Sequence, residues 1–381
     1  MQASELFHQP NTILLDGGMG TMLQAAGMKL GTRPEDLNIE NPELIRSIHA
    51  KYAAAGSRVV NANTFGASPH KLADSKYTLE EVITAGIANC KQAVAPYGAL
   101  VTLDVGPLGE LLEPSGTLAF EDAVAEYGRI VRAGVAAGAD ILYFETFTDL
   151  YEMKAALLAA KENSTLPIMA SMSFEANGRT FTGCTVESFA ATARGLGANA
   201  VGINCSLGPK EIFPMAKRLA EAVPGDFPVF VKPNAGLPRA DGSGYDITPQ
   251  LYAMQMKPYR DLHLFAAGGC CGTTPEFIQM LNGVFADCKP GRPEHPMLSV
   301  LCSPVDCVNV DGITVVGERI NPTGKKRFQQ ALRDGDMNYI LEQAVSQAEA
   351  GAQILDVNVG APGVDEPALM EQEVKALQSV V

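Results

Sequence analysis

Eight short, nearly continuous apolar segments recur along the first 290 residues, and helical patterns separate them. Apolar runs of this kind are typical of parallel strands covered on both faces, because neither face meets solvent. One of the helical patterns is PELIRSIHAKYAAAG, with Asn41 before it as a cap and Gly56 at its end. The predicted strands begin at Thr12, Ser57, Ala99, Ala139, Leu166, Ala198, Phe227 and Leu262.

Eight strand–helix units predict an α/β fold, a (β/α)8 TIM barrel, over residues 1–290. A doubly wound sheet is the alternative, but it usually has fewer strands and a GxGxxG opening, which GGMG after Asp16 does not match. Residues 291–310 are rich in proline and polar residues and predict a linker. Residues 311–381 show only two further units, too few to close a barrel, which indicates a truncated fragment of a second βα barrel.

Composition narrows the class of protein. The 381 residues are 46% hydrophobic and 19% charged, enough for two globular domains. A net charge of −14 without a basic stripe argues against nucleic acid as a partner, and the absence of an 18-residue apolar run argues against a membrane span. The first residues lack the apolar core of a signal peptide. Eight cysteines in such a chain favour a reducing compartment, so we expect a cytoplasmic protein.

Three cysteines stand at predicted strand ends. Cys205 follows the apolar run AVGIN, and Cys270 and Cys271 are adjacent in GGCCGTTP. The carboxyl ends of barrel strands meet at one rim, so these thiols can converge. Three sulfur ligands without a fourth leave an open position on a tetrahedral zinc, as a catalytic site requires. Two other interpretations stay open: buried cysteines that pack as small apolar groups, and a redox pair, although redox pairs usually have two residues between their sulfurs.

The predicted ligand set has a definite chemistry. Three thiolates and Zn²⁺ sum to −1, which makes a weak Lewis acid suited to binding another thiol and holding it as thiolate. An unbound thiol has a pKa of about 8.5 and is only a few per cent ionised at neutral pH. The expected reaction is therefore attack by a substrate thiol on an electrophile.

Polar groups at the other strand ends are candidates for substrate binding. Asp16 and Glu145 suit an ammonium group, whereas backbone N–H groups in the two glycine-containing turns suit a carboxylate. Any single rim residue could instead cap a turn. The five histidines are scattered and are interpreted as structural. The predicted substrate-binding residues are Asp16, Gly17, Gly18, Asn63, Thr64, Glu145 and Asn234.

The segments DGGMGT, NANTFG, the strand ending in Cys205, and GGCCGTTP together resemble the homocysteine S-methyltransferase family over roughly residues 5–290. The resemblance implies that Cys205, Cys270 and Cys271 are catalytic zinc ligands that hold the homocysteine thiolate for methyl transfer, which forms methionine. It also implies that Asp16 and Glu145 lie near the amino acid. Asn234 is expected where a weak ligand could fill the vacant zinc position before substrate binds.

The tail, with VVGERINPTGKKRF and ILDVNVGAPGVDE, resembles the opening of a pterin-binding, methyltetrahydrofolate domain. A homocysteine barrel followed by a folate barrel resembles the cobalamin-dependent methionine synthases. This order implies methylcobalamin as the methyl donor, carried by a separate corrinoid-binding domain or protein. The residues that resemble part of a pterin site are Glu318, Asn321, Asp356 and Asn358.

Two other functions stay open. The donor could be betaine or S-methylmethionine, although such enzymes resemble single barrels without the GERINPTG tail. The chain could also be a zinc-storage or corrinoid-protein docking module without turnover.

Overall fold

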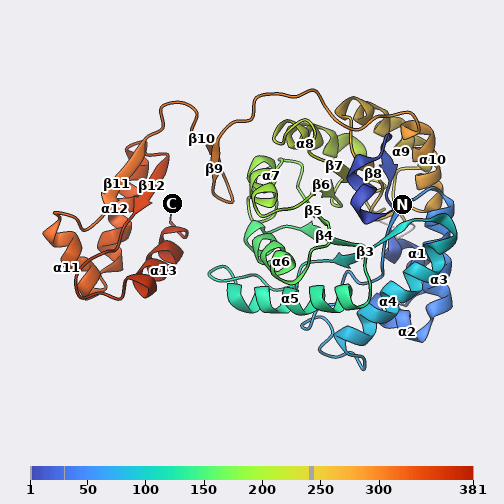
Figure 1. The fold of residues 1–381 in the computed structure, drawn as a ribbon, viewed down its shortest axis with the longest axis horizontal. Helices are drawn as coiled ribbons and strands as arrows, with labels where there is room; N and C mark the ends of the chain where they lie inside the picture. The colour runs from blue at the N-terminus through green and yellow to red at the C-terminus, as the bar shows by residue number, and fades with distance from the viewer. Residues whose placement is uncertain (1, 30, 240–243, 381) are drawn as a thin grey trace. The chain divides into compact units, whose positions relative to one another are not determined.

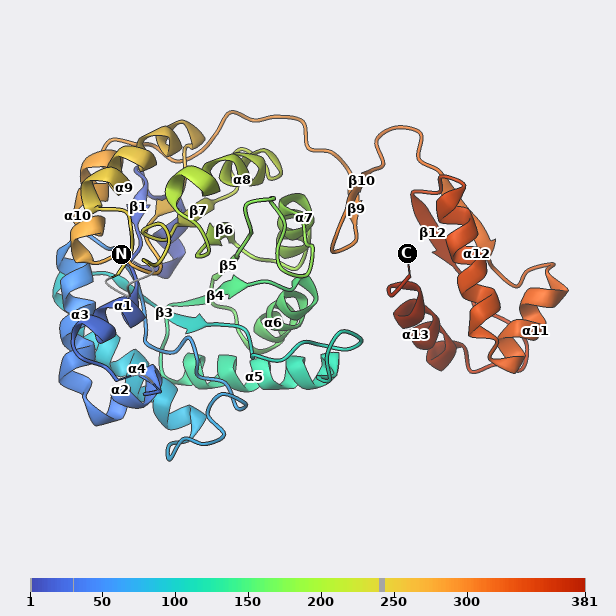
Figure 2. The ribbon, with the colours of Figure 1, turned by 180° about the vertical axis from the view of Figure 1, so that it is seen from behind.

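A computed structural model describes residues 2–29, 31–239 and 244–380. Eight parallel strands form one sheet in the order β1-β8-β7-β6-β5-β4-β3-β2, and a parallel bridge between Leu15 and Val59 joins the two ends of that order. The sheet curls into a barrel ringed by helices (Figures 1 and 2). The predicted TIM barrel is confirmed. The strands are β1 (Ile13–Leu14), β2 (Val59–Asn61), β3 (Leu100–Val105), β4 (Ile141–Phe147), β5 (Ile168–Met172), β6 (Ala200–Asn204), β7 (Val229–Lys232) and β8 (Ala266–Ala267).

Helices connect each strand to the next, and local signals fix where several begin. In α3 (Pro42–Ala54), the predicted cap Asn41 accepts a hydrogen bond from the Leu44 N–H at 3.3 Å, and proline occupies the first turn. The other helices of the barrel are η1 (Ala3–His8), α1 (Met19–Ala25), η2 (Pro34–Asp36), α2 (Leu37–Glu40), α4 (Leu79–Val94), η3 (Ala95–Tyr97), α5 (Phe120–Ala136), α6 (Leu150–Asn163), α7 (Val186–Gly195), α8 (Pro209–Glu221), α9 (Pro249–Met256), η4 (Lys257–Leu262) and α10 (Pro275–Phe285).

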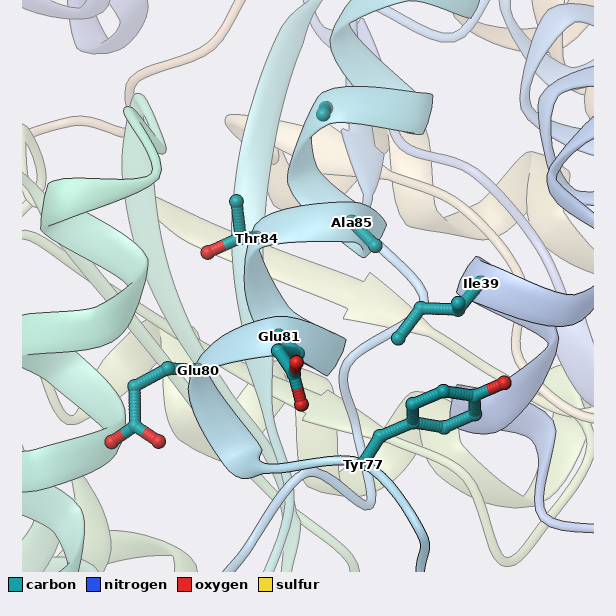
Figure 3. Close-up of a pocket in the computed structure, with 7 residues that line it drawn as sticks. Ile39, Tyr77, Glu80, Glu81, Thr84 and Ala85 are labelled. Atoms are coloured by element: carbon teal, nitrogen blue, oxygen red, sulfur yellow. The ribbon is translucent and has the colours of Figure 1, made fainter.

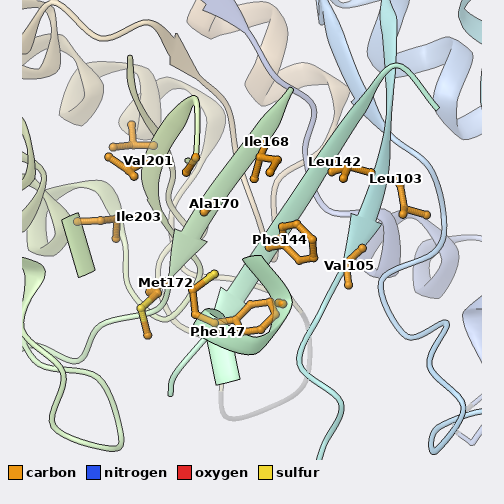
Figure 4. Close-up of a cluster of buried hydrophobic side chains, with 14 of the residues drawn as sticks. Leu103, Val105, Leu142, Phe144, Phe147, Ile168, Ala170, Met172, Val201 and Ile203 are labelled. Atoms are coloured by element: carbon orange, nitrogen blue, oxygen red, sulfur yellow. The ribbon is translucent and has the colours of Figure 1, made fainter. Parts of the chain in front are cut away.

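Strand alternation divides the core into two layers. In β4, Ile141 and Tyr143 belong to an apolar cluster inside the barrel, whereas Leu142 and Phe144 belong to the larger cluster between strands and helices (Figure 4). Each large side chain buried in this way contributes roughly 1.5–3 kcal/mol. The same alternation carries Glu145, two residues after Tyr143, to the inner face, so polar groups follow apolar ones inside the barrel.

Side chains of the neighbouring strands alternate between the inside and the outside of the barrel in the same way. Phe230 of β7 lies in the interior cluster and is followed two residues later by Lys232, which is 2% exposed. Leu100 of β3 lies there too, and Asp104, four residues later, is 6% exposed. The barrel therefore has an apolar lower interior and a buried, charged upper interior at the carboxyl ends of its strands.

A second compact unit consists of Leu298–Cys302 and the chain from Cys307 onward. In the segment predicted as a linker, β9 (Val300–Cys302) and β10 (Cys307–Asn309) pair as an antiparallel hairpin. The two predicted strands beyond it are present as the parallel pair β11 (Val316–Ile320) and β12 (Ile354–Val357). Their helices are α11 (Lys326–Asp334), α12 (Met337–Glu349) and α13 (Glu366–Leu377). Among the described residues, no helix is both long and apolar enough to span a membrane.

Candidate metal centre

The three cysteines singled out from the sequence meet at the carboxyl end of the barrel. Cys205 directly follows β6, and Cys270 and Cys271 lie in the turn after β8. Their sulfur atoms all lie within 4.8 Å of one another, and the Cys205 and Cys271 Sγ atoms are 3.9 Å apart. Two sulfurs on a tetrahedral zinc, each about 2.3 Å from the metal, are separated by about 3.8 Å. The arrangement therefore fits zinc.

Backbone geometry holds the sulfurs in place. Cys205 has a φ of 63°, a left-handed conformation that turns the chain directly after β6. The Cys270 N–H donates to the Pro233 carbonyl at 2.9 Å, and the Cys271 carbonyl accepts from the Ala235 N–H at 2.9 Å. The loop after β7 thus braces the turn that carries both adjacent cysteines.

The Gly17–Gly18 turn packs tightly beside the cysteines. A Cβ atom on Gly18 would lie 2.8 Å from the Cys270 carbonyl oxygen, and one on Gly17 would lie 2.8 Å from the Tyr52 ring. The Gly18 N–H donates to the Thr273 carbonyl at 3.2 Å. Both positions therefore require glycine because backbone and side chains approach closely there.

The thiols are electrostatically coupled. Hydrogen bonds from Cys205 and Cys270 lower the pKa of Cys271 to about 3, whereas the hydrogen bond to Cys205 is the largest of several causes that raise the pKa of Cys270. Three sulfurs this close cannot all carry negative charge unless a cation compensates it. The cluster is therefore suited to a positive ion.

Asn234 supplies a further potential ligand. Its side chain is 5% exposed, and its Oδ1 atom has no hydrogen-bond partner among the described residues. A buried carbonyl oxygen without a partner costs about 1–3 kcal/mol. Such an atom, two residues beyond the end of β7, is available to a metal or to a bound molecule.

A buried ion-pair network lies below the cysteines in the barrel mouth. Lys232 Nζ lies 3.0 Å from Asp16 Oδ1 and 3.4 Å from Glu145 Oε2. Burial alone would lower the pKa of Lys232, but the two carboxylates outweigh it and hold that pKa well above its usual value. Burial raises the pKa of Glu145, and Lys232 opposes this shift. The ammonium group of Lys232 is therefore paired with both carboxylates, Asp16 and Glu145.

Asp104 adds a third acidic group to this network. Its Oδ1 atom is buried and has no hydrogen-bond partner in the described part of the chain. Burial, and then the nearby Glu145 carboxylate, raise its pKa well above the usual value. Burial and the neighbouring Glu145 thus both disfavour the ionised form of the Asp104 carboxyl group.

The side chains of Asn63 and Thr64 brace the turn after β2. Asn63 Nδ2 donates to Pro34 O at 2.8 Å and to Asn38 Oδ1 at 2.9 Å, and Thr64 Oγ1 donates to Asp104 O at 2.8 Å. These bonds use both Nδ2 hydrogens of Asn63 and the hydroxyl of Thr64. Their role in substrate binding stays a prediction.

The four residues that resemble part of a pterin site lie in the second unit, on or just after β11 and β12. The Asn358 N–H donates to the Ile320 carbonyl at 2.9 Å, which brings the two strand ends together. Glu318 pairs with Lys325 at 3.3 Å, and Asn321 accepts a hydrogen bond from Thr323. Asp356, like Glu318, is exposed. Only two strand ends contribute to this group.

A shallow apolar hollow on the outer wall of the barrel is a separate feature (Figure 3). Its lining includes Tyr77, Ala85 and Ala88 on and before α4, together with Ile39 of α2. None of the candidate cysteines or carboxylates lines it. The hollow lies on the outer wall of the barrel and is therefore separate from the cysteines and carboxylates at the strand ends.

Two residues at the centre were not predicted from sequence. Lys232 was detectable, because a lysine at an inward position of the apolar strand FPVFVK must be paired inside the barrel. Tyr245, whose ring lies against Gly272 in the turn after the adjacent cysteines, had no such signal. It reaches the site through the folding of a loop.

Comparisons with known proteins agree with this geometry. A profile of the homocysteine S-methyltransferase family matches residues 13–285. The methionine synthase of Mycobacterium tuberculosis (strain ATCC 25618 / H37Rv) is 30% identical over 390 aligned residues, which cover 96% of this chain. The chain spans about a third (32%) of that protein's length.

Solved structures of the homocysteine methyltransferase MmuM from Escherichia coli share the barrel. The oxidized form superposes with a TM-score of 0.64 at 25% identity, covering 74% of this chain and 98% of MmuM. The metallated form gives a TM-score of 0.61 at 26% identity, covering 73% and 98%.

Proposed function

Because the chain belongs to the homocysteine S-methyltransferase family, we propose that its barrel binds zinc through Cys205, Cys270 and Cys271 and activates homocysteine for methyl transfer from methylcobalamin. The product is methionine. The observation that carries this proposal is the cluster of three converging sulfurs beside a buried, acidic barrel mouth. A cytoplasmic location, which keeps thiols reduced, suits the same chemistry.

The thiolates determine what the centre can do. When bound, zinc supplies the positive charge that keeps a substrate thiol ionised at neutral pH. The three cysteines supply soft, electron-rich donors and leave one coordination position open. Asn234 is proposed to offer its unpartnered oxygen at that position before substrate arrives.

The charged network is proposed to select an amino acid. Asp16, Glu145 and Lys232 together carry a net charge of −1, so one substrate ammonium neutralises them. Asp104, whose buried Oδ1 atom has no hydrogen-bond partner among the described residues, can take part in a hydrogen bond beside them. The Gly17 N–H is proposed to receive the substrate carboxylate, whereas the Gly18 N–H already donates to Thr273.

The second unit favours methylcobalamin as donor over betaine or S-methylmethionine. The similarity to the mycobacterial methionine synthase covers 96% of the chain, whereas the MmuM fold covers only 73–74% of it. The corrinoid is proposed to come from a separate domain or protein.

Assay of methyl transfer to homocysteine from free methylcobalamin tests the proposal. Zinc-loaded protein without turnover would indicate a storage or docking module instead.

Binding of homocysteine to the zinc-loaded chain at pH 7 is expected to release close to one proton. The free thiol, with a pKa of about 8.5, arrives protonated and becomes ionised in the site. The release should fall towards zero as the pH rises above about 9, because the thiol is then already ionised. Calorimetry in buffers of different ionisation enthalpy measures it. Methionine, which has no thiol proton, is the control, and zero release with homocysteine would mean that its thiol binds uncharged or elsewhere.

We propose that residues 311–381 are the beginning of a pterin-binding domain and that these 381 residues bind methyltetrahydrofolate weakly. A pterin site needs polar groups from several strand ends, and here two provide Glu318, Asn321, Asp356 and Asn358. Val315 and Val316 are about half exposed, at 52% and 51%, which favours self-association.

Deletion of residues 311–381 should leave zinc and homocysteine binding unchanged and reduce self-association in sedimentation experiments. Micromolar folate binding, or loss of zinc on deletion, would contradict this division.

A further inference from the structure

Two cysteines stand opposite each other in the hairpin of β9 and β10. The register of this antiparallel pair places Cys302 directly across from Cys307. The Ser303 N–H donates to the Asp306 carbonyl at 3.0 Å, so the next pair towards the turn is a hydrogen-bonded one. Hydrogen-bonded and non-hydrogen-bonded pairs alternate along antiparallel strands, which makes Cys302 and Cys307 a non-hydrogen-bonded pair. In such a pair the two side chains lie on the same face and approach each other most closely.

The spacing of this pair suits a disulfide bond. Opposite residues of a non-hydrogen-bonded pair have Cα atoms about 4.5 Å apart, and disulfides span Cα separations of about 4.4–6.8 Å. The short connection through Pro304 and Val305 fixes the register, because a two-residue hairpin loop leaves little room for a slip. Cys302 is exposed and Cys307 is partly buried, so an oxidant in solution can reach the first sulfur.

The turn between the two cysteines is bound to the barrel. This turn, Ser303–Asp306, belongs to the first unit. Three of its backbone carbonyls accept hydrogen bonds from residues just before α7 and in its first turn. The bonds run from the Thr185 N–H to Pro304 O at 3.3 Å, from Arg179 Nη1 to Val305 O at 2.9 Å, and from Ser188 Oγ to Asp306 O at 3.1 Å. Because backbone atoms make these contacts, the contacts depend on the conformation of the turn.

We propose that Cys302 and Cys307 form a redox-sensitive disulfide that holds this turn in its bound conformation. The inference goes beyond homocysteine chemistry and does not depend on zinc. In a reducing compartment such a bond is transient and senses oxidants. A bond between the two strand ends removes conformations in which the turn is open, and so favours the conformation that contacts the barrel.

The reaction needs a small disulfide, such as oxidised glutathione, as its oxidant. The Cys302 thiolate attacks one sulfur of this oxidant, which breaks the glutathione S–S bond, forms a mixed disulfide and releases one glutathione thiolate. The Cys307 thiolate then attacks the Cys302 sulfur and releases the second glutathione. The two cysteine sulfurs are oxidised, glutathione disulfide is reduced to two thiols, and the two cysteine protons end on those thiols.

Peptide mapping tests the bond after treatment with oxidised glutathione and alkylation of the remaining thiols. A protease that cleaves before aspartate separates the two cysteines, because Asp306 stands between them in the sequence. Cys302 then lies in residues 287–305 and Cys307 in residues 306–310. Before reduction these two peptides are expected as one linked species, and dithiothreitol should separate them.

Two variants identify the sulfurs in the link. Cys302→Ser should abolish the linked species. Cys288→Ala is the matched control, because Cys288 lies in the same peptide as Cys302 and its loss should leave the link intact. A link that survives in Cys302→Ser would overturn the proposal, and so would glutathione that stays on Cys302 without being displaced by Cys307.

Hydrogen exchange tests the effect of the bond on the turn. The Thr185 amide donates to the Pro304 carbonyl, so it should exchange several-fold more slowly in the oxidised chain than in the reduced chain. The Val82 amide, in the first turn of α4, is the internal control and should exchange equally in both. Equal rates at Thr185 would contradict the proposed hold on the turn, even if the disulfide forms.

Discussion

Replacement of Cys271 by alanine is expected to abolish zinc binding and methyl transfer together. Structural zinc sites with four ligands bind with roughly 10–16 kcal/mol, so one thiolate is worth about 3 kcal/mol and its loss should weaken binding more than about 100-fold. The two sulfurs that remain, those of Cys205 and Cys270, are too few ligands to hold the metal in the geometry that a catalytic site needs. Metal analysis after dialysis and an assay with free methylcobalamin measure both effects.

Cys288→Ala is the matched control for this prediction. Cys288 is buried, and its carbonyl accepts a hydrogen bond from the Thr12 N–H just before β1, at the opposite end of the barrel. This variant should keep one zinc per chain and normal turnover. Stoichiometric zinc and normal activity in Cys271→Ala would show that the three-sulfur cluster is not the metal site.

Replacement of Lys232 by methionine is expected to destabilise the barrel by about 3–5 kcal/mol at neutral pH. The substitution leaves Asp16 and Glu145 buried at the strand ends without the cation that lies 3.0 and 3.4 Å from them. Urea denaturation of the zinc-free chain, followed by circular dichroism, measures the change. Homocysteine binding should weaken as well, because the geometry of both carboxylates depends on Lys232.

The effect of Lys232→Met should depend on pH with a definite sign. The pKa of Lys232 is raised in the folded protein, so the stability that it provides is fully present at pH 7 and is lost only as the pH rises through that high value. Without Lys232, burial would raise the pKa of Glu145 further. A carboxyl group that binds protons more tightly when folded loses stability as the pH rises, so the deficit of the variant should shrink towards acid pH.

Lys91→Met provides the comparison for a solvent-exposed ion pair. Lys91 lies 3.1 Å from Asp140, but the lysine side chain is 42% exposed, so its loss should cost less than about 1 kcal/mol. Equal stability losses in the two lysine variants would mean that burial of the Lys232 network contributes nothing.

Much of the fold was predictable because apolar runs and helical periods are local properties of the chain. The eight strands follow from runs such as AVGIN and FPVFV, whose composition is set by burial on both faces. The three thiols were also predictable, because parallel strands in a barrel all end at one rim and Cys205, Cys270 and Cys271 each follow a predicted strand. The hairpin of β9 and β10 was not foreseen, because its residues show no clear apolar alternation.

Sequence by itself determined the barrel, the end of it at which the cysteines and charged residues gather, and the residue types that reach that end. Only the tertiary structure decided how these residues are used. It paired Asp16 and Glu145 with Lys232, assigned the side chains of Asn63 and Thr64 to a turn, and left Asn234 Oδ1 without a partner among the described residues. These outcomes depend on which side chains from distant strands share one small volume. Alternation gives the face of a strand that a residue occupies, but only the closed barrel fixes its neighbours.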